Sequence, residues 1–271
     1  MTRGAGGSAA GPIGGAFAKA RAEGRVALVP YVTAGDPDIA STRGIVRGLQ
    51  RGGADVVEIG VPFSDPIADG PVNQRSAERA LRNGVTLRSV LDLTIDLRRD
   101  GAPPIVLFTY YNPIHRMGLA GFAHEARRSG VAGVLVTDLP PEEAGELRAS
   151  LDAEAIDLID LLSPTSSPER VALVAREGRG FLYFISRTGV TGVQEDLPAD
   201  LEARVRAARA ISPLPVAVGF GIGRPEQVRA VAGFADGVVV GSALVRLIEE
   251  AGRADDLPAR VEAFCRGLVG R

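Results

Sequence analysis

Eight short apolar runs, each rich in valine, isoleucine or leucine, recur along the chain and are separated by longer amphipathic segments. Several of the runs are apolar at almost every position, which is typical of parallel strands that are buried on both faces. Because parallel strands must be joined by crossovers, usually helices, the pattern predicts repeated β–α units. The runs cover residues 26–32, 56–61, 105–111, 131–136, 155–162, 181–186, 215–220 and 236–242.

The segments between the runs carry helix signals. Apolar residues recur at helical spacing in residues 39–51 and 86–99. Pro168 and Pro225 stand where a first helical residue is expected, a position that proline favours. Residues 14–23 predict an extra helix before the first strand. We therefore predict an α/β fold, a (β/α)8 TIM barrel with an extra N-terminal helix, and keep a doubly wound open sheet as the alternative.

Length and composition are consistent with one domain. The chain has 271 residues, and such a barrel typically needs ~250. No long polar linker divides it, so we expect a single domain over residues 1–271. Residues 1–12 are rich in glycine and alanine, and we expect them to form a flexible tail.

The charge balance argues against several classes of protein. The formal net charge is −2, from 31 basic and 33 acidic residues, so neither a nucleic acid nor a membrane is expected as a partner. No secretory signal and no apolar run of the ~18 residues that a membrane helix needs is present. The one cysteine excludes an internal disulfide. We expect a cytoplasmic protein.

Glu58 is an acidic residue inside an otherwise apolar strand, on the same face as Val56 and Gly60. Burial disfavours the charged form of a carboxyl group and raises its pKa toward the range that suits proton transfer at neutral pH. Glu58 is therefore the first candidate for acid–base catalysis. The alternative is a structural glutamate paired with an arginine.

Two aspartates follow in the loop after this strand. Asp69 precedes Gly70, Pro71 and a helical segment, so on position alone it serves equally well as a helix cap. Asp65 precedes a proline and is more typical of a turn.

Glycines mark the ends of the last three predicted strands, in residues 186–192, 219–223 and 241–242. Barrels of this type commonly bind phosphate with the loops after strands seven and eight and with a helix N-terminus. Backbone N–H groups can approach an anion closely at glycine, and the helix dipole favours negative charge. Together with Glu58, this pattern predicts an enzyme for a small phosphorylated substrate; ordinary tight turns are the alternative.

The residue inventory limits the reaction. Carbon–carbon cleavage needs an electron sink, but Lys19, the one lysine, lies before the first strand and far from the expected site. His115, His124 and Cys265 form no obvious metal site, so no metal is expected. If the enzyme cleaves a carbon–carbon bond, the substrate must carry its own sink.

Several motifs resemble the tryptophan synthase α subunit family, in its order and spacing, from about Ile13 to the C-terminus. They are Pro30 to Pro37, Glu58 to Pro71, Asp138 to Glu143, Ser186 to Gly192, and Gly219 to Ile222. The resemblance implies a lyase that splits indole-3-glycerol phosphate into indole and glyceraldehyde 3-phosphate by retro-aldol cleavage in tryptophan biosynthesis. The indole ring would then be the sink.

The resemblance also implies roles for individual residues. Glu58 would move the proton between the glycerol hydroxyl and indole C3, Asp69 would hold the indole N–H, and Tyr183 would stand near Glu58. Thr191 would close a loop over the site. The phosphate would lie against Gly192, Gly221, Gly241 and Ser242, and the indole against Tyr31 and Phe108.

The family resemblance further implies a β subunit as partner, in an α2β2 heterotetramer. Pyridoxal phosphate is expected only in that β partner, and no cofactor in this subunit. Phe63 and Asp65 are candidates for contact with it. The chain departs from the expected pattern at Asn73, Thr137 and Tyr111. Three other functions stay open: a different phosphate-binding barrel enzyme, a weakly catalytic activator subunit, or a stand-alone lyase that releases indole.

Overall fold

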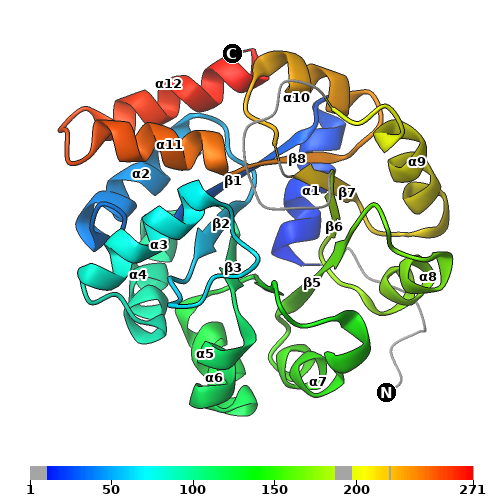
Figure 1. Ribbon diagram of the computed structural model, residues 1–271, viewed down its shortest axis with the longest axis horizontal. Coiled ribbons are helices and arrows are strands. Elements are labelled where there is room, and N and C mark those ends of the chain that lie inside the picture. The colour runs from blue at the N-terminus through cyan, green and yellow to red at the C-terminus, as the bar shows by residue number, and fades with distance from the viewer. Residues whose placement is uncertain (1–10, 187–196, 220, 271) are drawn as a thin grey trace.

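Parallel strands form a closed barrel in the computed structural model, which describes residues 11–186, 197–219 and 221–270. Each strand pairs with the next, and β1 pairs with β8 through the register of Leu28 with Val238 (Figure 1). This closure confirms the barrel and excludes the open sheet. The strands are β1 Ala27–Thr33, β2 Val57–Gly60, β3 Ile105–Thr109, β4 Gly133–Val136, β5 Asp157–Leu162, β6 Leu182–Ile185, β7 Val216–Gly219 and β8 Gly237–Val240.

Helices surround the barrel and connect its strands (Figure 1). The extra N-terminal helix is confirmed as α1. None of the described helices is long and apolar enough to cross a membrane. The helices are α1 Pro12–Ala22, α2 Ile39–Arg51, α3 Pro71–Arg82, α4 Leu87–Arg99, α5 Tyr111–Met117, α6 Leu119–Ser129, η1 Pro141–Glu143, α7 Gly145–Ala153, α8 Pro168–Glu177, α9 Leu201–Ile211, α10 Pro225–Ala232, α11 Ser242–Ala251 and α12 Leu257–Val269.

Capping residues fix where several helices begin. The Asp38 carboxylate accepts a hydrogen bond from the Ser41 backbone N–H at 2.7 Å at the start of α2. Thr86 and Ser89 cap α4 reciprocally. Pro168 and Pro225 stand at the first positions of α8 and α10, as predicted. These contacts satisfy backbone N–H groups that a helix leaves without internal partners.

The predicted third strand was too long by two residues. β3 ends at Thr109, and Tyr111 already begins α5. The Asp138 carboxylate accepts the Tyr111 backbone N–H at 2.7 Å, so this N–H pairs with the loop after β4 instead of a strand neighbour. Sequence alone could not show this partner, because it lies 27 residues away.

Strand residues alternate between two apolar environments. In β2, Val57 and Ile59 belong to the cluster shared with the outer helices. Val56, one residue earlier, belongs to the cluster that fills the barrel lumen. Glu58 and Gly60 follow Val56 at the two-residue period of a strand and therefore face the lumen.

Helix α1 closes the N-terminal end of the barrel, where Ile13 and Phe17 enter the lumen cluster. A Cβ atom on Gly133 would lie 2.8 Å from Ile13, and one on Gly237 would lie 2.7 Å from Phe17. These two strand positions therefore need glycine to admit the helix. With this end filled, the lumen can receive a ligand only from the opposite end, where strands end and loops begin.

Candidate active site

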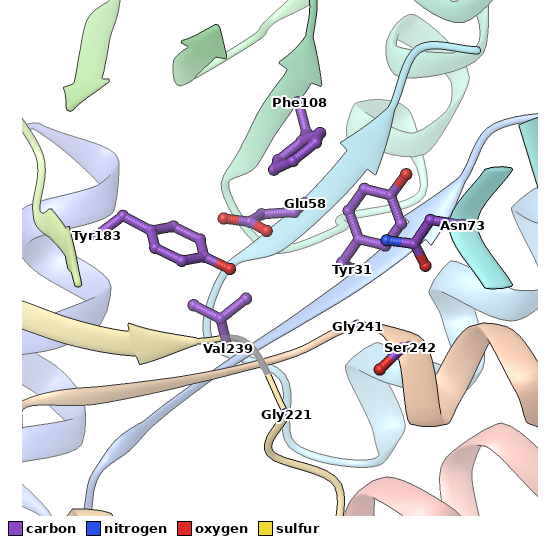
Figure 2. Close-up of a pocket in the computed structure, with 9 residues that line it drawn as sticks. All are labelled: Tyr31, Glu58, Asn73, Phe108, Tyr183, Gly221, Val239, Gly241 and Ser242. Atoms are coloured by element: carbon purple, nitrogen blue, oxygen red, sulfur yellow. The ribbon is translucent and has the colours of Figure 1, made fainter. Parts of the chain in front are cut away.

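A small cavity opens at the C-terminal end of the barrel. Its walls come from the strands and from the loops that follow them (Figure 2). An acid and aromatic rings form one part, and glycines with a helix start form another. The lining residues are Tyr31, Glu58, Asn73, Phe108, Tyr183, Gly221, Val239, Gly241 and Ser242.

Glu58 is the acid in this cavity, and its side chain points into it (Figure 2). The residue is 0% exposed, and neither carboxyl oxygen has a hydrogen-bond partner among the described residues. Burial raises the pKa of Glu58 from its ordinary value of 4.5 to about 8. No arginine pairs with it in the described structure, so the structural alternative has no support. At neutral pH the carboxyl is mostly protonated and can donate a proton.

Aromatic side chains flank Glu58. Tyr31 and Phe108 meet edge to face, with ring centroids 5.1 Å apart. The Tyr31 hydroxyl lies 3.2 Å from the Thr33 hydroxyl. Tyr183 is fully buried on the other side of Glu58 (Figure 2). Its pKa is raised by burial first and then by the nearby carboxyl of Glu58. These rings form an apolar slot beside the acid.

Two glycines make room for the two tyrosines. A Cβ atom on Gly60 would lie 2.2 Å from the Tyr31 hydroxyl, and one on Gly219 would lie 2.3 Å from the Tyr183 hydroxyl. Since real Cβ atoms do not approach other atoms so closely, these two lumen positions must lack a side chain. The glycines of β2 and β7 therefore fix the positions of both rings.

Replacing Gly219 with alanine is expected to lower the free energy of unfolding by about 1–3 kcal/mol, the usual cost of overpacking a core. The added methyl would also lie 2.6 Å from two ring carbons of Tyr183, so the ring has to leave its place. Thermal unfolding measures the effect. Gly145→Ala is the matched control, because a Cβ atom there meets nothing within 4 Å. Equal midpoints for Gly219→Ala and the wild type would contradict this packing.

Asp69 lies next to the cavity, in the loop between β2 and α3. Its carboxylate accepts hydrogen bonds from the Tyr110 hydroxyl, at 2.9 Å, and from the Asn73 side chain. Burial raises the pKa of Asp69 above 3.8, while both hydrogen bonds oppose that rise. Asp69 is not the cap of α3, because Gly70 occupies that position. The capping alternative is therefore wrong.

Both acids belong to one electrostatic site. The carboxylate of Asp69 and that of Glu58 each raise the pKa of Tyr31 and that of Tyr183, after the larger effect of burial. Such effects fade quickly with distance, so the two acids face the same pair of rings. Glu58 in the cavity and Asp69 next to it therefore act on the same pair of rings.

The middle and C-terminal half of helix α3 are held by a partly buried ion pair. Asp36 accepts hydrogen bonds from Ser76, at 2.5 Å, and from two nitrogens of Arg79, at 2.7 and 2.8 Å. Arg79 also donates to Glu249 of α11 at 2.7 Å. These bonds tie α3 to the loop after β1 and to α11. The C-terminal half of α3 is thereby held against the C-terminal half of α11.

The other end of the cavity suits an anion. Gly241 is the N-terminal cap of α11 and Ser242 its first residue, and no side chain of the described structure caps this helix. The N–H groups at such a helix start can bind an anion, which the helix dipole also favours. Gly221 lies beside them with a φ of +87°, a conformation that favours glycine. In α10, by contrast, Gln227 already accepts the N–H groups of Gly223 and Arg224.

Phe63 and Asp65 lie outside the cavity, along a surface groove between the loop after β2 and α3. Phe63 packs on Tyr110, with ring centroids 5.0 Å apart. Asp65 is exposed and accepts a hydrogen bond from Ser64 at 2.6 Å. Ile67 in the same groove is 80% exposed.

The described residues hold no group of three or more side chains that could bind a metal ion. His115 packs on Tyr111 in α5, with ring centroids 5.7 Å apart, and His124 lies 3.4 Å from Glu154 on the surface. Cys265 lies on the buried face of α12, away from the cavity, and burial raises its pKa to about 12. None of these side chains lines the cavity.

The structure brings together most of the residues that the sequence singled out, although their roles stay predictions. Thr191 and Gly192 lie outside the described residues. Tyr110 was not predicted as a partner of Asp69, although the two-residue period of β3 places Tyr110 on the same side as Phe108. It identified Asn73 only as a departure, because a sequence cannot show which face of α3 meets the cavity.

Comparison with known proteins gives one family. A model of the family Tryptophan synthase alpha chain matches residues 17–269. The tryptophan synthase alpha chain of Geobacter sp. (strain M21) is 53% identical over 256 residues, which are 93% of this chain and 96% of that protein. A crystal structure of tryptophan synthase subunit alpha from Legionella pneumophila str. Paris has a TM-score of 0.88 at 38% identity, covering 97% of this chain and 98% of that one. A structure of the tryptophan synthase complex from Pyrococcus furiosus has a TM-score of 0.84 at 41% identity, covering 90% and 98%.

Proposed function

Because the chain belongs to the tryptophan synthase alpha chain family, we propose that Glu58 and Asp69 carry out its lyase reaction in the barrel cavity. The chain is a lyase that cleaves indole-3-glycerol phosphate into indole and glyceraldehyde 3-phosphate. One observation carries the assignment of residues. Glu58 is a buried carboxyl without a partner among the described residues, in a cavity that has an aromatic slot and an anion site.

The cavity suits the two ends of this substrate. The phosphate binds at Gly221, Gly241 and Ser242, where the N-terminus of α11 supplies N–H groups. Gly192 joins this set in our proposal. The indole ring lies in the slot formed by Tyr31 and Phe108, whose apolar faces cover it. The carbon chain between the two ends then passes Glu58.

In the first step, protonated Glu58 donates its proton to indole C3. The ring becomes an indoleninium cation, and the Asp69 carboxylate stabilises it by accepting a hydrogen bond from the positively charged N–H group. The hydrogen bonds that Tyr110 and Asn73 donate to Asp69 favour its ionised form. The proposed mechanism uses Glu58 in its protonated form and Asp69 in its ionised form, a division that suits acid–base chemistry.

In the second step, the Glu58 carboxylate takes the proton from the hydroxyl next to the ring. The bond between indole C3 and the hydroxyl-bearing carbon breaks, its electrons return to the ring, and that carbon becomes the aldehyde of glyceraldehyde 3-phosphate. Glu58 is protonated again, so no proton is gained or lost overall. Tyr183 packs beside Glu58 and helps to exclude water. We propose that Thr191 closes a loop over the cavity.

We propose that the groove of Phe63, Asp65 and Ile67 contacts a β subunit. Exposed Ile67 gives the groove an apolar contact, and Phe63 joins it to Asp69 through Tyr110. A partner at the groove could therefore act on the active site through two packed residues. The name of the Pyrococcus furiosus structure, a tryptophan synthase complex, supports such a partner. We propose an α2β2 assembly, with pyridoxal phosphate in the β subunit and no cofactor in this chain.

The rate of cleavage, measured as kcat/KM, is expected to follow a bell-shaped dependence on pH. Glu58 has to be protonated to donate, so activity falls as pH rises through its pKa of about 8. Asp69 has to be ionised to stabilise the cation, so activity falls at acidic pH, at a value above 3.8 because burial raises its pKa. A profile that keeps rising well above pH 8 would contradict the role of Glu58.

The direct test of the function is indole release from indole-3-glycerol phosphate by the purified chain, with and without a β subunit. We expect release by the chain alone and faster release with the β subunit. Release that the β subunit leaves unchanged would favour a stand-alone lyase. No release under either condition, with β-subunit activity enhanced, would leave only an activator subunit.

A further inference from the structure

Asn73 places a polar side chain in the cavity wall without a complete set of partners. Its side chain is 6% exposed and lies at the third position of helix α3, beside Tyr31 (Figure 2). Its carbonyl oxygen Oδ1 is buried and has no hydrogen-bond partner among the described residues. A buried acceptor without a partner is costly, and at a ligand site it indicates a group that the ligand supplies.

Chemistry fixes which end of the amide faces the cavity. The side chain of Asn73 is hydrogen-bonded to the Asp69 carboxylate. A carboxylate in its ionised form can only accept, so the amide NH2 group must face Asp69. The other end, Oδ1, is then left for the cavity. In Figure 2 this oxygen points toward the side where Gly241 and Ser242 lie.

An amide oxygen can only accept a hydrogen bond, so it cannot bind the phosphate of the substrate. The substrate carries three kinds of donor: the ring N–H, the hydroxyl next to the ring, and the hydroxyl on the middle carbon of the glycerol chain. Asp69 takes the first and Glu58 the second in the proposed function. The middle hydroxyl lies between the ring end and the phosphate end of the chain. Asn73 lies beside Tyr31, and its oxygen points toward the side of Gly241 and Ser242 (Figure 2).

We propose that Asn73 is a specificity-determining residue whose Oδ1 atom accepts a hydrogen bond from the middle hydroxyl of the substrate. The same side chain donates to Asp69, so it links recognition of the carbon chain to the position of the second catalytic acid. This inference rests on the proposed function of Asp69 and Glu58. It explains why a polar residue occupies this position in the cavity wall, where the sequence pattern favours an apolar one.

The test compares two substrates on two proteins. One substrate is indole-3-glycerol phosphate, and the other has hydrogen in place of the middle hydroxyl. The second can still be cleaved, because the bond that breaks joins the ring to the first carbon. Wild-type kcat/KM is expected to fall about three- to tenfold with the second substrate, the size of one neutral hydrogen bond. The Asn73→Leu variant is expected to cleave the two substrates with equal kcat/KM.

Asn112→Leu is the matched control, since it makes the same change at an exposed helical position outside the cavity. It is expected to discriminate between the substrates as the wild type does. If the absence of the middle hydroxyl lowers kcat/KM equally in the wild type and in Asn73→Leu, the proposal is overturned. If Asn73→Leu does not fold, wild-type discrimination below about twofold overturns it alone. If the wild type cleaves neither substrate, the proposed function itself is refuted.

Discussion

Replacing Glu58 with glutamine is expected to abolish indole formation, with kcat lowered by at least ~1,000-fold. Glutamine has the same shape but cannot donate a proton to indole C3 or accept one from the substrate hydroxyl, and general acid–base catalysis alone contributes ~100- to 10,000-fold. Glu58 acts in both proton transfers, so its loss removes both. Initial rates of indole release measure the effect. Binding of a phosphorylated ligand is expected to survive, because the anion site is on other strands.

Asp157→Asn is the matched control for this variant. Asp157 is another buried lumen carboxyl, on β5, whose pKa burial raises to about 7, but it does not line the cavity. Its replacement is expected to leave kcat within a few-fold of wild type. Turnover of Glu58→Gln within a few-fold of wild type would defeat the assignment of Glu58.

The Glu58 carboxyl is also expected to make the stability of the wild-type protein depend on pH. The folded-state pKa of about 8 lies above the ordinary value of 4.5, so the fold favours protonated Glu58. Its stabilising contribution is complete below pH 4.5 and is lost as pH rises through 8. Wild-type unfolding free energy should therefore fall relative to Glu58→Gln across this window, at about 1.4 kcal/mol per pH unit at most. The catalytic acid thus costs the protein stability.

Replacing Asp69 with asparagine is expected to lower kcat by at least ~100-fold, the effect of one positioned electrostatic group. Asparagine can still accept the Tyr110 hydrogen bond, so the loop keeps its contacts. It carries no negative charge, however, and cannot stabilise the indoleninium cation in the same way. Steady-state rates with indole-3-glycerol phosphate measure the loss.

Two further variants are compared with Asp69→Asn: one that weakens the hydrogen bonding of Asp69 and one control. Tyr110→Phe removes one hydrogen bond to the carboxylate and is expected to cause a smaller loss, with the acidic limb of the pH profile moved upward. Asp92→Asn makes the same substitution as Asp69→Asn at an exposed position of α4 and is expected to be silent. Full activity of Asp69→Asn would leave Asp69 with a purely structural role in its loop.

The sequence was sufficient for the fold because its signals were local. Apolar runs and helix starts such as Pro168 repeat along the chain, and the closed barrel follows from their order. The same alternation placed Glu58 in the lumen. It did not give the end of β3, because the group that pairs with the Tyr111 backbone N–H, Asp138, lies in another loop.

The site was less accessible to sequence than the fold. A capping role for Asp69 could not be separated from a role in the cavity until Tyr110, 41 residues away, was seen to donate to it. Nothing in the sequence indicates that Oδ1 of Asn73 is buried without a hydrogen-bond partner among the described residues. The need for glycine at positions 60 and 219 depends on tyrosines in neighbouring strands, and only the register of the barrel shows this.

Proton donation by Glu58 requires that its carboxyl group is protonated at neutral pH, and its pKa can be measured directly. Carbon-13 labelling of the glutamate carboxyl groups allows each to be followed by NMR as pH changes, and the signal absent from Glu58→Gln identifies Glu58. We predict that this signal titrates with a midpoint near 8. A midpoint near the ordinary value of 4.5 would mean that the carboxyl is ionised at neutral pH, and would exclude Glu58 as the proton donor to indole C3.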